Sequence, residues 1–205
     1  MPSNDSKGRA SGPLLSIVAC VLLAGATQAY ADLSAASREG DVARRSGVQI
    51  AVPELKMVRQ DGARVRLDRE LNDGRPVVVN FVYTSCTTIC PMTSLEFELL
   101  QKRLGKDRQR VHLVSISIDP EQDTPARLRD YAEHFHANSE WDYYTSDAAT
   151  SVTAQVAFGV YRGDKMSHIP VTLLRTAPGN QWVRLDGLAT AEQMYSELQG
   201  LLARR

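Results

Sequence analysis

Short apolar runs alternate with amphipathic stretches along most of the chain, and this pattern predicts strands that alternate with helices. Residues 77–83 (VVVNFVY) and 111–118 (VHLVSISI) are rich in β-branched side chains, as buried central strands are. The other predicted strands are a pair within 53–67 that turns at Asp61-Gly62, 141–145, 171–175 and 182–185, and the predicted helices are 91–104, one that starts at Asp123-Thr124-Pro125, 148–158 and 191–202.

The helix over 91–104 is predicted from the proline at its start and from an apolar stripe along its length. Pro91 suits the first position of a helix, because proline lacks the N–H that this position leaves unpaired. The apolar residues that recur at helical spacing are Met92, Leu95, Leu99 and Leu100.

This order of elements predicts an α/β fold with a mainly parallel sheet and helices on both faces. The hairpin that joins 171–175 to 182–185 adds an antiparallel edge. The order is that of a thioredoxin-like fold, in which helices flank a mixed central sheet, with an extra N-terminal hairpin.

The N-terminal segment has the three parts of a secretory signal. Residues 1–12 are polar and positively charged, residues 13–25 are apolar and uncharged, and Ala29-Tyr30-Ala31 is a small-x-small cleavage pattern. This predicts a signal peptide over 1–31, and an uncleaved anchor formed by the uncharged residues 12–31 is the alternative. Residues 32–50 are predicted to be a linker, and 51–205 the folded domain.

The net charge of the chain and its predicted export limit the functions that it can have. The chain has 24 basic and 24 acidic residues, and this balance excludes a nucleic-acid binder, which needs a basic face. An exported protein meets an oxidising compartment, in which neighbouring cysteines can form a disulfide.

Cys86 and Cys90 lie between the strand that ends at Tyr83 and the helix that starts at Pro91. Ligands of open α/β sheets bind beyond the carboxyl ends of the strands, and this loop lies there. A helix N-terminus lowers the pKa of a nearby thiol, and a thiolate is both a nucleophile and a ligand for soft metals. A separation of four residues allows both sulfurs to point to one side, so a disulfide and a shared metal ion are both compatible with the spacing.

Three motifs in this order resemble the Sco/SenC family. They are FVYTSCTTICP over 81–91, SIDPEQDTP over 117–125, and His168 before the next strand. The resemblance implies a thioredoxin-like domain that binds one copper ion, Cu(I) or Cu(II), through Cys86, Cys90 and His168. Asp119, in the second motif, is predicted either to orient a ligand or to cap a turn.

The resemblance also implies a metallochaperone, without enzymatic turnover, that delivers copper to an exported cuproprotein such as cytochrome c oxidase. The alternative is a thiol-disulfide reductase that uses Cys86 and Cys90 as a redox-active pair on partner cysteines, and it does not need His168. The predicted partners are a copper-accepting protein and a thiol redox partner. The predicted location is the periplasmic side of a bacterial inner membrane, either soluble after cleavage near Ala31 or tethered through residues 12–31.

Overall fold

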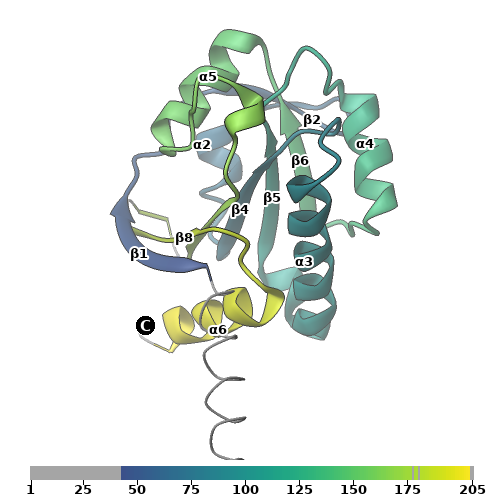
Figure 1. The fold of residues 1–205 in the computed structure, drawn as a ribbon. Helices are drawn as coiled ribbons and strands as arrows, with labels where there is room; N and C mark the ends of the chain where they lie inside the picture. The colour runs from purple at the N-terminus through teal and green to yellow at the C-terminus, as the bar shows by residue number, and fades with distance from the viewer. Residues whose placement is uncertain (1–42, 177, 180, 204–205) are drawn as a thin grey trace, which may run out of the picture. The chain divides into compact units, whose positions relative to one another are not determined.

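The computed structural model describes residues 43–176, 178–179 and 181–203, so the predicted leader lies outside the described residues. Its core is an eight-stranded sheet in the order β1-β8-β7-β4-β5-β6-β2-β3 (Figure 1). The strands are β1 (Arg44–Gln49), β2 (Lys56–Arg59), β3 (Arg64–Arg66), β4 (Val77–Val82), β5 (His112–Ser117), β6 (Trp141–Thr145), β7 (Val171–Arg175) and β8 (Gln181–Asp186). The helices are α2 (Leu67–Glu70), α3 (Ile89–Leu104), α4 (Pro125–His134), α5 (Ala148–Ala157) and α6 (Ala191–Leu202), with the 3-10 segments η1 (Gly105–Arg110) and η2 (Lys165–Ser167).

The sheet is mixed, and the predicted mainly parallel sheet is wrong. Only the pairs β4–β5 and β5–β6 are parallel, while the other strand pairs described are antiparallel. The reason is that the β7–β8 hairpin returns beside β4, and that β1 and the β2–β3 hairpin add antiparallel edges. The predicted mixed central sheet and the extra N-terminal hairpin are therefore confirmed.

The folded part begins earlier than the linker prediction over 32–50 allows. Residues Arg44–Gln49 form β1, which pairs along its whole length with β8, from Arg44 opposite Asp186 to Gln49 opposite Gln181. Its side chains are exposed or half-buried, so this edge strand lacks the apolar run that marks a buried strand. The linker boundary at residue 50 is thus wrong.

Helices cover both faces of the sheet, as predicted (Figure 1). On one face, Phe97 of α3 packs on Trp141 of β6, with ring centroids 5.5 Å apart. On the other, Phe158 at the end of α5 packs on Phe81 of β4 at 5.6 Å. Phe81 lies opposite Ile116, and Ile116 lies opposite Tyr144, so these three side chains share one face. Trp141 is three residues before Tyr144 and therefore points to the other face.

Helix α3 buries a different face from the one that the sequence pattern predicted. Phe97, Leu100 and Leu104 are buried, whereas Met92, Leu95 and Leu99 are exposed. The helix also begins at Ile89, two residues before the predicted start, so Cys90 belongs to its first turn and faces the core. Within residues 43–203, apart from the two gaps, none of the helices has the length and apolar character of a membrane span.

Candidate functional site

The structure brings Cys86 and Cys90 together where β4 ends and α3 begins. After β4 the chain turns, and the N–H of Cys86 donates to the carbonyl of Tyr83 at 3.2 Å. The N–H of Cys90 then donates to Sγ of Cys86 at 3.4 Å. Both thiols are free, and Cys86 is 7% exposed while Cys90 is 1% exposed. The predicted placement of the pair beyond a central strand is confirmed.

The pKa values of the two thiols are shifted in opposite directions from that of an ordinary cysteine. Burial raises the pKa of Cys86, but the backbone N–H groups of Cys90 and Thr88 stabilise its thiolate and bring the pKa down to about 7. Cys90 is more deeply buried, and burial raises its pKa to about 12. At neutral pH a large share of Cys86 is therefore thiolate, whereas Cys90 remains a protonated thiol.

Asp123 holds the cysteine loop, the turn from Thr84 to Cys90, in place through hydrogen bonds, a role that the sequence did not reveal. Its carboxylate accepts hydrogen bonds from the hydroxyl of Thr84 at 2.6 Å, from the N–H of Thr84 at 3.1 Å and from the hydroxyl of Ser117 at 2.6 Å. The sequence placed Asp123 only at the start of a helix, whereas the helix cap is Thr124. The signal that could have found it is an acidic residue after a buried strand.

His168 lies beside β4, where its ring nitrogen Nε2 is 3.1 Å from the carbonyl oxygen of Phe81. Since a carbonyl only accepts, Nε2 carries the proton and Nδ1 keeps its lone pair. Burial lowers the pKa of His168, so the ring is neutral at neutral pH. Among the described residues, His, Cys, Asp and Glu side chains form no group of three that could hold a metal ion, so His168 is not brought into one coordination group with the cysteines.

Asp119 has the predicted turn role and a second one. Its backbone carbonyl accepts from the N–H groups of Gln122 and Asp123, which closes the turn after β5. Its carboxylate accepts from Nζ of Lys165 at 2.6 Å, in η2, three residues before His168. Asp119 thus holds the segment that carries His168, and its bond to Lys165 replaces the expected bond to a ligand side chain.

Tyr83 and Met166, which the sequence did not single out, complete the surroundings of Cys86. The hydroxyl of Tyr83 donates to the sulfur of Met166 at 3.8 Å, and Tyr83 is among the groups that lower the pKa of Cys86. Burial raises the pKa of Tyr83 to about 12, so this hydroxyl keeps its proton. Nζ of Lys165 lies 5.8 Å from the centre of the Tyr83 ring.

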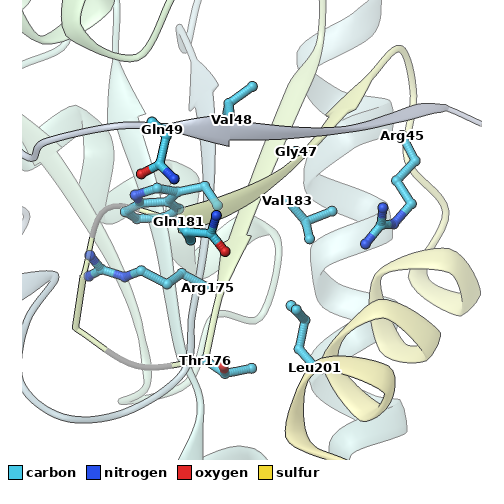
Figure 2. Close-up of a pocket in the computed structure, with 10 residues that line it drawn as sticks. Arg45, Gly47, Val48, Gln49, Arg175, Thr176, Gln181, Val183 and Leu201 are labelled. Atoms are coloured by element: carbon cyan, nitrogen blue, oxygen red, sulfur yellow. The ribbon is translucent and has the colours of Figure 1, made fainter. Parts of the chain in front are cut away.

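A cavity of about 500 Å³ lies elsewhere, between β1, the β7–β8 hairpin and α6 (Figure 2). Arg175 on its wall pairs with Val77 at the start of β4, whereas the cysteines follow the end of β4. The Arg175 guanidinium lies 4.3 Å from the centre of the Trp182 ring and donates to the carbonyl of Leu71 at 2.5 Å. These contacts link chain segments, and the cavity is remote from the thiols.

The SCO1/SenC family model matches residues 44–203. The chain belongs to the SCO1/SenC family. The SCO1 protein homolog of Bacillus subtilis is 33% identical over 94 residues, which are 45% of this chain and 48% of that protein. The chain spans about half, or less, of the length of the curated relatives that it matches.

Solved Sco structures share the fold. Bradyrhizobium japonicum ScoI, solved with copper bound, has a TM-score of 0.59 and 23% identity, and the match covers 78% of this chain and 99% of that one. BsSco, a member of the Sco family of cytochrome c oxidase assembly proteins with a disulfide switch, has a TM-score of 0.64 and 23% identity, over 77% of this chain and 96% of that one. The predicted family and thioredoxin-like fold of this Sco protein are thus confirmed.

Proposed function

We propose that this Sco protein is a copper-binding metallochaperone, in which Cys86, Cys90 and His168 hold one Cu(I) ion as cargo. The observation that carries the proposal is the thiol pair at the end of β4, because the N–H of Cys90 supports a Cys86 thiolate at neutral pH. Thiolate and imidazole are the donors that a soft monovalent ion prefers, and this favours Cu(I) over Cu(II).

The hydrogen bond of His168 also fits a metal ligand. Histidines that bind metals usually donate their other N–H to a carboxylate or a carbonyl, which fixes the ring and its tautomer. In this protein Nε2–H is bonded to the carbonyl of Phe81, so Nδ1 is the nitrogen available to an ion. For all three donors to contact one ion, the segment that carries His168 must approach the thiols.

The recipient and the location are part of the same proposal. ScoI of Bradyrhizobium japonicum binds copper, and BsSco belongs to a family of cytochrome c oxidase assembly proteins, which supports delivery to that oxidase or to another exported cuproprotein. Residues 1–31 would export the domain to the periplasmic side of a bacterial inner membrane, either tethered through 12–31 or free after cleavage. There a thiol redox partner would keep the two cysteines reduced, because a disulfide removes two of the three donors.

Anaerobic titration of the reduced full chain with Cu(I), against a chromophoric chelator, tests the proposal. We expect one Cu(I) per chain and loss of tight binding in Cys86→Ser and in Cys90→Ser. His168→Ala should weaken binding by more than the roughly 10- to 100-fold that loss of an outer partner costs. His134→Ala, which removes an exposed imidazole at the end of α4, is the matched control. Unchanged Cu(I) affinity in His168→Ala would refute the ligand assignment.

The reductase alternative is distinguished with the same variants. A thiol-disulfide reductase needs the nucleophile Cys86 and the buried Cys90 but not the imidazole. Disulfide-reductase activity that is high in the wild type and unchanged in His168→Ala, together with weak Cu(I) binding, would replace the metallochaperone proposal.

A further inference from the structure

Met166 combines exposure with a contact to the candidate site. Its side chain is 74% exposed, yet its sulfur lies 3.8 Å from the hydroxyl of Tyr83. Tyr83 is also among the groups that lower the pKa of Cys86. One side chain, Tyr83, is therefore a neighbour of both the solvent-facing thioether and the Cys86 thiol.

Several contacts hold this thioether in place. Its own N–H donates to the Asp164 carboxylate at 2.9 Å, and the preceding Lys165 is bonded to Asp119 at 2.6 Å. Two residues later, His168 is bonded to the carbonyl of Phe81. Residues 166–168 thus run beside the end of β4, with Met166 at Tyr83 and His168 at Phe81. The short segment carries a soft sulfur and a ring nitrogen to the same strand.

A thioether differs from a thiolate in two respects that matter here. It is neutral and carries no proton, so its metal binding does not depend on proton loss. It also cannot form a disulfide. Like a thiolate, it is a soft donor that suits Cu(I) and is poorly matched to hard cations such as Mg²⁺ and Ca²⁺.

We propose that Met166 is the entry ligand for copper: its thioether captures Cu(I) at the surface and passes it to Cys86. This inference rests on the proposed function. In the transfer the Cu–Sδ bond breaks and a Cu–Sγ bond forms, and copper remains monovalent throughout. Any proton still on the Cys86 thiol goes to solvent, so the step needs no oxidant or reductant.

Methionine methyl resonances provide a direct test. The reduced full chain, labelled with ¹³C at the methionine methyl groups, is titrated anaerobically with less than one equivalent of Cu(I), and Met166→Leu assigns the Met166 signal. We expect the Met166 methyl to shift from the first additions. Met57, which is buried in β2 three strands away from β4, is the internal control and should not shift.

Loading rates supply the second readout. Met166→Leu keeps the apolar shape and removes the sulfur, so it should slow the transfer of Cu(I) from a chelator to Cys86, and an unchanged rate would overturn the entry role. An unmoved Met166 methyl in a chain that binds one Cu(I) through Cys86 would overturn the entry role and leave the proposed function standing. Absence of tight Cu(I) binding to the wild type would instead overturn the proposed function, and the entry role with it.

Discussion

Iodoacetamide at pH 7 is expected to alkylate Cys86 about 250 times faster than Cys90 in the reduced protein, because only Cys86 has a stabilised thiolate. The two thiols are four residues apart and share one loop and helix start. Their difference comes from backbone N–H groups that point at one sulfur and from the burial of the other.

The magnitude follows from the two acidities. With a pKa of about 7, half of Cys86 is thiolate at pH 7, and with a pKa of about 12 roughly one Cys90 in 10⁵ is. The thiolate populations thus differ about 50,000-fold. A more basic thiolate is also more nucleophilic, with a Brønsted slope of about 0.4–0.5, and over five pKa units this returns roughly 200-fold to Cys90. The expected ratio of the two rates is therefore about 250, and the lower exposure of Cys90 slows its alkylation further.

Peptide mapping after timed alkylation measures both rates in one sample, because fragmentation between residues 86 and 90 separates the two labels. The rate at Cys86 should reach half of its maximum near pH 7. The control is the same reaction in concentrated urea, where both thiols lose their surroundings and should react at similar rates. Equal rates in the folded protein, or faster labelling of Cys90, would refute the assignment of Cys86 as the thiolate.

Three further outcomes are expected. Asp123→Asn replaces an acceptor oxygen with a donor, so urea denaturation should show a loss of about 1–3 kcal/mol, and the Cys86 alkylation profile should move to higher pH as Thr84 is released. Arg175→Met should cost about 2–4 kcal/mol through its lost carbonyl bonds and Trp182 stacking, with Cys86 alkylation unchanged, and a shifted profile would contradict the separation of the two regions. Cu(I) affinity should fall as the pH drops below about 7, because protons then compete for Cys86, and a flat chelator-competition profile from pH 8 to 5 would contradict thiolate ligation.

Elements that bury a continuous apolar run were predictable from the sequence. Strands β4, β5 and β6 were placed to within a residue or two, because all or nearly all of their side chains are buried and most of them are apolar. Strand β1 was missed because an edge strand is held by its backbone bonds to β8 while its side chains remain polar. The outward face of α3 was misread because Met92, Leu95 and Leu99 carry the apolar spacing on the exposed side.

The candidate site also has features that could be predicted from the sequence and features that could not. The spacing and position of Cys86 and Cys90 were enough to predict that they meet, since both belong to one turn of chain. The contacts of Asp123, Lys165 and Met166 were not predictable, because each joins residues between 39 and 83 positions apart. No local pattern encodes such contacts, and only the assembled sheet sets them.

The turn between β5 and α4 connects the two halves of the proposed copper site. At one end of the turn, Asp119 holds Lys165 and with it the segment that carries His168. At the other, Asp123 holds Thr84 and with it the cysteine loop, and its own N–H donates to the carbonyl of Asp119 at 2.9 Å. Because one short turn fixes both donor segments, a disturbance of it moves the imidazole and the thiols together. Release of the Lys165 contact alone would free the segment that carries His168, while the Asp123 contact would keep the cysteine loop in place.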